Sequence, residues 1–199
     1  MSRAGNSSHE VEVKIRISEI AAIRARLRRH GFRVAKRRVF EVNDVFDTPG
    51  AVLRLNKQLL RVRQAGPLTT LTFKDKPLTA KHKTREEIEL TLSDAKAFGD
   101  ILERLGYQVN FRYEKFRTEF TRPADAGTIL LDETPIGNFI ELEGTPEWID
   151  ATARLLGFHE GDYINSSYAS LYFADCASRG VVPSHMVFHG QSAKLKLST

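Results

Sequence analysis

Residues 9–17 read HEVEVKIRI, with valine or isoleucine at each odd position from 11 onward and a charged residue at each even position. A β-strand sends successive side chains to opposite faces, so this segment has one apolar face and one charged face. In an ordinary antiparallel strand, the apolar face would be buried and the charged face would lie in water. The same alternation returns in almost every later predicted strand, however, and its charges are not scattered.

Acids occur on these faces as Glu-x-Glu pairs, and the acidic positions are Glu10, Glu12, Glu87, Glu89, Glu141 and Glu143, together with Asp132. Bases occur largely as Arg-x-Arg or Lys-x-Arg pairs, and the basic positions are Lys14, Arg61, Arg63, Lys74, Arg85, Lys115 and Arg117. A solvated sheet face has no reason to pair its charges in this way, whereas the interior of a polar barrel does. A barrel of roughly eight strands has room for one elongated ligand. The sequence therefore predicts an α+β fold: a closed antiparallel β-barrel of about eight strands, with a charged tunnel and helices packed outside.

Amphipathic helices are predicted between the strands. Their predicted starts are Ser18-Glu19, Ser93-Asp94 and Thr145, and a last, weakly amphipathic helix is predicted at residues 163–177. The second helix is expected to turn Phe98, Ile101, Leu102 and Leu105 inward. A unit of charged strand, serine-capped helix and glycine-aromatic stop occurs twice, at a constant offset of 75 residues. We therefore expect two related halves whose charged faces meet in the barrel.

The length of 199 residues suits one domain,. We expect a frayed N-terminus at residues 1–8, a single barrel domain at 9–178 and a polar tail at 179–199. No apolar run could cross a bilayer and no signal peptide is evident, so a cytoplasmic protein with no membrane partner is expected. The lone Cys176 excludes an intrachain disulfide and a cysteine-based zinc cluster,. A formal net charge of +5 favours an anionic partner,.

The two kinds of charge point to one chemistry. Carboxylates are the hard oxygen ligands that Mg²⁺ or Mn²⁺ prefer. Guanidinium and ammonium groups are the cations that a chain of phosphates needs. A glycine-rich phosphate-binding loop of either common type is absent from the sequence,. These patterns predict a metal-dependent site for a phosphate chain, built from strands.

Glu10-x-Glu12-x-Lys14 resembles the ExExK signature of the CYTH superfamily, also called the triphosphate tunnel metalloenzymes. The resemblance runs from about residue 9 to about residue 173, and its elements follow one another in family order. They are Phe46-Asp47-Thr48-Pro49, Leu60-Arg61-Val62-Arg63, Thr72-Phe73-Lys74, Arg85-Glu86-Glu87-Ile88-Glu89, Lys115-Phe116-Arg117, Asp132-Glu133, residues 137–143 and Ser167-Tyr168. Within the superfamily, the chain is most similar to class IV adenylate cyclases of the CyaB type.

This resemblance implies roles for the charged residues. One or two divalent metals, Mg²⁺ or Mn²⁺, would be held by Glu10, Glu12, Glu141 and Glu143, with Asp132. The triphosphate would be bound by Lys14, Arg61, Arg63, Lys74, Arg85, Lys115 and Arg117. Glu87 and Glu89 would complete a metal shell or tune the neighbouring arginines. We hypothesise that the metal activates the nucleophile with help from an acid of the Glu10/Glu12 pair or from Lys14, although no unique base follows from the sequence.

Several functions share this tunnel. The leading interpretation is an adenylate cyclase, in which the ribose 3′-hydroxyl attacks the α-phosphorus of ATP and pyrophosphate leaves. The alternative is a triphosphatase for inorganic triphosphate or thiamine triphosphate, in which water attacks the terminal phosphorus. A non-catalytic binder of polyphosphate or nucleotide would gain nothing from so many carboxylates. A nucleic-acid domain using the arginines at residues 24–29 ranks last, because such a run is more often a solvated helix face.

Other residues carry weaker signals. Ser166, Ser167 and Tyr168 would either touch a nucleotide or cap the last helix. Tyr113 is expected to serve in packing rather than in base stacking. His185 and His189 stand four residues apart, but a preceding proline argues against a helical zinc site,. The identity of the triphosphate, a homodimer and the role of the tail are left open by the sequence.

Overall fold

The structure is a computed structural model that describes residues 6–77, 82–123 and 125–189, leaving out the side chains of residues 6–10 and of Lys83. The strands are β1 (Asn6–Ile17), β2 (Arg33–Asp47), β3 (Leu59–Ala65), β4 (Leu68–Lys74), β5 (Lys83–Thr91), β6 (Gln108–Thr121), β7 (Thr128–Thr134), β8 (Gly137–Glu143) and β9 (Tyr163–Ile164). The helices are α1 (Ile20–Arg29), α2 (Val52–Leu55), α3 (Ala95–Arg104), α4 (Pro146–Leu155) and α5 (Tyr168–Ser178), with a 3₁₀ turn at Glu160–Asp162.

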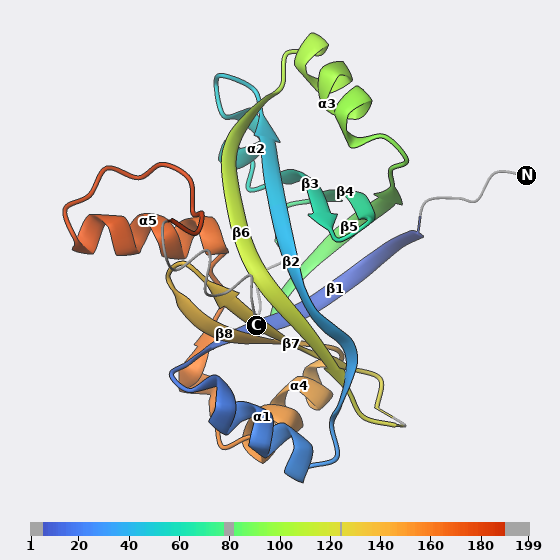
Figure 1. Ribbon diagram of the computed structural model, residues 1–199, viewed down its shortest axis with the longest axis vertical. Helices are drawn as coiled ribbons and strands as arrows, with labels where there is room; N and C mark the ends of the chain where they lie inside the picture. The colour runs from blue at the N-terminus through green and yellow to red at the C-terminus, as the bar shows by residue number, and fades with distance from the viewer. Residues whose placement is uncertain (1–5, 78–81, 124, 190–199) are drawn as a thin grey trace, which may run out of the picture.

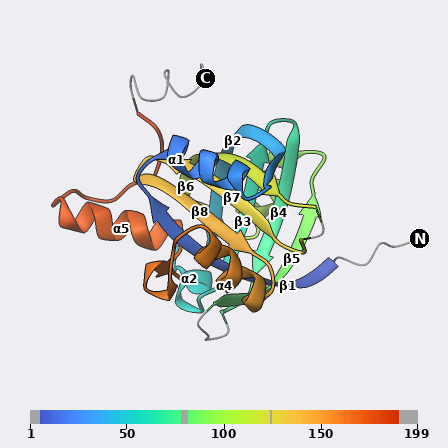
Figure 2. The same ribbon diagram turned by 90° about the horizontal axis from the view of Figure 1, so that it is seen from below.

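Eight of these strands close into an antiparallel barrel, as the sequence predicted. The sheet runs in the order β5-β4-β3-β2-β6-β7-β8-β1, and the pairing of β1 with β5 closes it. One half of β1 pairs with β5, and the other half pairs with β8. The short strand β9 pairs with β1 beyond the end of β5. Figure 2 shows the barrel from the end that carries α1 and α4.

The barrel turns its apolar side outward and its charged side inward. Val13 and Ile15 of β1 lie in a core cluster with residues of β7, β8, α1 and α4. Both helices cover the same end of the barrel (Figure 1), and Leu27 and Ile149 are fully buried there. Side chains alternate along a strand, so the packing of this face against helices directs the alternate residues, Glu12 and Lys14, into the interior,.

The two related halves predicted from the repeat are present. The units β1-α1-β2 and β5-α3-β6 have the same order of elements, and β1 pairs antiparallel with β5 while β2 pairs antiparallel with β6. In the first pair, Glu10 lies opposite Arg85, the residue 75 positions later. The halves therefore meet about an approximate two-fold axis, which brings both charged faces into one interior.

Three predicted helix features were wrong. Helix α1 begins one residue later than predicted, because Glu19 rather than Ser18 occupies the cap position. In α3, Ile101 and Leu105 are 52% and 67% exposed, because this helix reaches the small cluster at its end of the barrel chiefly through Leu102. The last helix begins at Tyr168 rather than at residue 163, because Ser167 caps it and the preceding residues form β9.

The C-terminal segment, residues 181–189, is not the polar tail that the sequence predicted. Met186 is fully buried, and its backbone N–H and C=O bond to Arg112 O and to Glu114 N at 3.0 and 2.9 Å. It occupies the edge of β6 that β7 leaves unpaired, since β7 pairs only with residues 116–120. His185 accepts a hydrogen bond from the Arg112 N–H. Residues 190–199 lie outside the described part of the chain.

In the described residues, no helix is both long enough and apolar enough to span a membrane.

A prediction on folding concerns Trp148, the single tryptophan. A Cβ added at Gly127 would lie 2.4 Å from the Trp148 ring, whose Nε1 donates to Asp125 at 3.0 Å. We expect Gly127→Ala to destabilise the protein by about 1–3 kcal/mol through overpacking, measured by denaturant unfolding with tryptophan fluorescence. Gly99→Ala in α3 is the control: its Cβ meets nothing within 4 Å, so a gain of about 0.5–1 kcal/mol is expected. Equal stability of the two variants would contradict this packing.

Candidate active site in the barrel tunnel

The interior of the barrel holds two adjoining cavities. The wider one, about 670 Å³, opens between the turn after β2, helix α2 and the first turn of α5. The narrower one, about 480 Å³, opens near Lys36 and Glu119. The walls shared by both are formed by Arg61, Arg63, Lys74, Arg117 and Glu143. A linear molecule could therefore lie along the barrel axis in contact with these side chains.

Three carboxylates come together on one wall. Oxygens of Glu12, Glu141 and Glu143 all lie within 4.8 Å of one another. Their strands are neighbours, and Glu12 stands directly opposite Glu143 in the pairing of β1 with β8. Like charges in opposite positions are destabilising, so a divalent cation among these oxygens would relieve the repulsion. The donor set and its spacing fit Mg²⁺ or Mn²⁺.

Lys14 and Arg117 flank this cluster. Lys14 Nζ lies 2.6 Å from a Glu141 oxygen, and Arg117 donates to the other Glu141 oxygen. Burial alone would lower the pKa of Lys14, but the charges of Glu141 and Glu12 raise it above its usual value. Burial alone would raise the pKa of Glu141, but Lys14 and Arg117 hold it well below its usual range. Both groups are therefore ionised throughout the physiological pH range.

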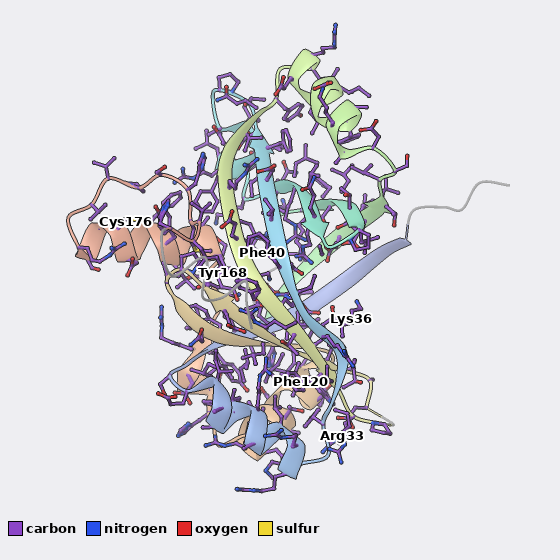
Figure 3. All side chains as sticks on the ribbon, in the orientation of Figure 1. Arg33, Lys36, Phe40, Phe120, Tyr168 and Cys176 are labelled. Carbon is purple, nitrogen blue, oxygen red and sulfur yellow. The ribbon has the colours of Figure 1, made fainter. Side chains whose placement is uncertain are left out.

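Asp132 is a buried anchor for the neighbouring cations. Its two oxygens accept from Arg117 Nε and Nη2 at 2.7 and 2.6 Å, a bidentate pair. Lys115 Nζ lies 2.9 Å away, and the Tyr168 hydroxyl donates at 2.7 Å. Figure 3 shows Tyr168 at the end of α5 that adjoins the barrel. Asp132 thus fixes the heads of two cations and one phenol.

The opposite wall is built by β3, β4 and β5. Arg61 donates to Thr72 at 3.1 Å, and Thr72 in turn donates to Glu89 at 3.2 Å. Lys74 forms an ion pair with Glu87 at 3.3 Å. The two glutamates thus lie among the cations of this wall, and both line the narrower cavity.

The family model described as the CYTH domain matches residues 8–167. The chain belongs to the CYTH family. A protein of Methanocaldococcus jannaschii, provisionally named an adenylate cyclase, is 28% identical over 147 residues, which span 74% of this chain and 83% of that one.

Solved structures share the CYTH fold. A Vibrio parahaemolyticus protein, provisionally called an adenylate cyclase, superposes with a TM-score of 0.70 at 21% identity and covers 83% of this chain and 98% of its own. A Pyrococcus horikoshii protein gives 0.70 at 25% identity, covering 83% and 99%. A Hippeastrum protein, provisionally named an adenylyl cyclase and described as having a dominant triphosphatase activity, gives 0.60 at 19% identity, covering 87% and 97%.

The CYTH barrel gathers most of the residues selected from the sequence. The wider cavity is lined by all seven predicted triphosphate-binding residues, which are Lys14, Arg61, Arg63, Lys74, Arg85, Lys115 and Arg117. Of the predicted metal ligands, Glu12, Glu141 and Glu143 form one group, and Asp132 is not part of it. The side chain of Glu10 lies outside the described residues. Ser167 caps α5 by accepting from Ser170 N, and both Ser167 and Tyr168 line the wider cavity.

Two residues of the barrel interior were missed by the sequence analysis. Glu41 of β2 is buried 3.6 Å from both Lys115 Nζ and Arg63 Nε. Burial alone would raise its pKa, but Lys115 and Arg117 lower it to about 2. Tyr113 was predicted only to pack, yet its hydroxyl lies 3.1 Å from Arg61. Glu41 has no paired acid two residues away, and a tyrosine carries no formal charge, so a search for charge pairs finds neither.

Proposed function

We propose that this CYTH protein is a metal-dependent enzyme in which a nucleophile attacks a phosphorus atom of a bound triphosphate and displaces the leaving group. The observation that carries the proposal is the meeting, in one tunnel, of a three-carboxylate cluster with seven cationic side chains. In a module that only bound anions, the three carboxylates would lower the affinity for phosphate, because their charge repels it. An enzyme that uses a divalent metal with its triphosphate needs both sets.

Glu12, Glu141 and Glu143 would hold the metal. When bound, Mg²⁺ or Mn²⁺ supplies charge stabilisation to the transferred group and the leaving oxygens. Asp132, predicted as a ligand, lies outside this three-carboxylate group and would instead act through Arg117 and Lys115, from which its oxygens accept hydrogen bonds.

The chain's cations would position the phosphates. Arg117 and Lys115 are oriented by Asp132 before the substrate enters, so little side-chain freedom is lost on binding. Arg61 and Lys74 approach from the opposite wall. A triphosphate between these walls would have its charge neutralised from both sides. The same donors would stabilise the negative charge that develops during displacement.

Adenylate cyclase chemistry is the proposed reaction. The wider cavity has an apolar part, formed by Phe46, Phe111 and Phe173, that phosphates would not need but a nucleoside could fill. The name of the M. jannaschii relative agrees with this assignment. The reaction would join the ribose 3′-oxygen to the α-phosphorus and release pyrophosphate.

Triphosphatase activity is the second candidate. The narrower cavity gives the tunnel a second opening near Lys36 and Glu119, by which water could reach a terminal phosphorus. The Hippeastrum neighbour, provisionally named an adenylyl cyclase, is described as having a dominant triphosphatase activity, which supports keeping this second candidate,.

Product analysis separates the two reactions. Purified protein with Mg²⁺ or Mn²⁺ would receive ATP or inorganic triphosphate in separate reactions, with products resolved by ion-exchange chromatography. Cyclic AMP with pyrophosphate is the expected result from ATP. Orthophosphate from inorganic triphosphate, with ATP nearly untouched, would establish the triphosphatase instead. Absence of turnover of either substrate would contradict the proposal of an enzyme.

A further inference from the structure

Tyr113 is a tunnel residue whose position is held from three sides. It lies on β6, is 7% exposed and lines the wider cavity. Its ring stacks on Phe111, with centroids 6.0 Å apart, and lies 6.2 Å from the ring of Tyr168. The residues before and after it, Arg112 and Glu114, are bonded to the backbone of Met186. The C-terminal segment thereby fixes the backbone that carries this phenol.

The hydrogen bonds of the Tyr113 hydroxyl are incomplete. Arg61 Nη1 donates to its oxygen at 3.1 Å. A guanidinium group has donors only, so it cannot accept the phenolic proton in return. Within the described residues, that proton has no acceptor. Tyr113 lines the wider cavity, so a ligand there with an anionic oxygen could accept this proton,.

The groups that face this phenol are mostly cationic. Arg61 and Arg63 approach from β3, and Lys115 lies two residues away on β6. Tyr168 from α5 packs against the ring of Tyr113, His185 from the C-terminal segment accepts from the neighbouring Arg112 N–H, and Glu41 from β2 lies beside Lys115. Burial alone would raise the pKa of Tyr113, but Arg61, Lys115 and Arg63 lower it to about 8.

We propose that Tyr113 contacts the triphosphate directly, donating its phenolic proton in a hydrogen bond to a phosphate oxygen. The proposal rests on the proposed function of the tunnel. In the free protein above pH 8, the negative charge of the phenolate is stabilised by the same cations that would bind a triphosphate. A bound triphosphate engages those cations and adds negative charge beside the phenol, so the pKa of Tyr113 rises and the phenolate takes up one proton from solvent.

This coupling has a definite sign. Below pH 8 the phenol is already protonated, so the affinity for triphosphate does not depend on Tyr113 ionisation. Above pH 8 each binding event must add a proton, and this residue alone weakens affinity by about tenfold per pH unit until the pKa of the complex is reached. In Tyr113→Phe, which keeps the ring, this extra weakening is absent.

Calorimetry tests the proposal without turnover. Inorganic triphosphate is titrated, with a metal chelator present, into the full-length protein and into Tyr113→Phe at about one unit below and one unit above pH 8. Two buffers of different ionisation enthalpy give the protons taken up. Above pH 8 the wild type should take up nearly one proton more than Tyr113→Phe, while ionisation of the triphosphate itself cancels between the two. Tyr107→Phe, partly buried outside the tunnel, should match the wild type.

A second measurement uses the wild type alone. The ultraviolet difference absorbance of tyrosinate should show one group titrating near pH 8, and triphosphate should move this titration upward by at least about one unit. An unmoved titration, or equal proton uptake by wild type and Tyr113→Phe, would overturn the role of Tyr113 while leaving the tunnel a triphosphate site. Failure of the wild type to bind triphosphate at either pH, both with the chelator and with Mn²⁺, would overturn the proposed function and this inference together.

Discussion

Replacing Glu12 with glutamine should lower triphosphate turnover by at least about a hundredfold while the barrel remains folded. Glu12 stands opposite Glu143 and within 4.8 Å of the other two carboxylates of the cluster. A glutamine keeps the shape of the side chain but removes one of the three charges that would hold the metal. The loss should appear mainly in kcat, since the cations that bind the triphosphate are unchanged.

Two measurements check this expectation. Steady-state kinetics give kcat and KM, and thermal unfolding with and without Mn²⁺ reports metal binding independently of turnover. A bound ion stabilises the folded protein, so Mn²⁺ should raise the melting temperature of the wild type but hardly that of Glu12→Gln. Glu103→Gln on the exposed face of α3 is the matched control and should resemble the wild type. An unchanged Mn²⁺ response in Glu12→Gln would contradict the metal role of this cluster.

Replacing Asp132 with asparagine should cost about 3–5 kcal/mol of stability. Arg117, Lys115 and Tyr168 all direct donors at the buried carboxylate of Asp132. The amide would present its own N–H groups to these donors and would leave buried cations short of negative charge. Because triphosphate would supply the missing charge, it should raise the melting temperature of Asp132→Asn more than that of the wild type.

Asp44 gives a matched comparison on the surface. It also receives a bidentate pair from an arginine, Arg112, whose side chain is 46% exposed. Solvent screens that pair, so Asp44→Asn should cost no more than about 1 kcal/mol. Denaturant unfolding measures both variants. A cost for Asp132→Asn as small as that for Asp44→Asn would show that the buried network is not what stabilises this wall.

The predicted helices show where local patterns stop being informative. Thr145 caps α4 and accepts from Trp148 N as the sequence indicated, because capping depends on a few neighbouring residues,. Ile101 and Leu105 repeat at helical spacing, yet both are exposed. The apolar stripe of α3 is wider than the surface beneath it, and only the packed structure shows how much of a stripe is covered.

The sequence by itself determined the barrel and the composition of its interior. Alternation along a strand is a local property, so the position of Glu12 or Arg61 in the repeat assigns it to one face. The offset of 75 residues also predicted that two similar units would meet. These features depend on spacing alone, and the structure agrees with them.

The tertiary structure decided which of these charges meet. Glu12 reaches Glu141 and Glu143 because β1 pairs with β8. Asp132 on β7 meets Arg117 and Lys115 because both lie on β6, the strand that pairs with β7. The first contact depends on the pairing of β1 with β8, which joins residues more than a hundred positions apart, and the second depends on the register between the neighbouring strands β6 and β7. Tyr113 owes part of its setting to the C-terminal segment, whose Met186 pairs with it from more than seventy positions away in the sequence. No local pattern encodes those contacts, because each arises from packing that the whole chain creates.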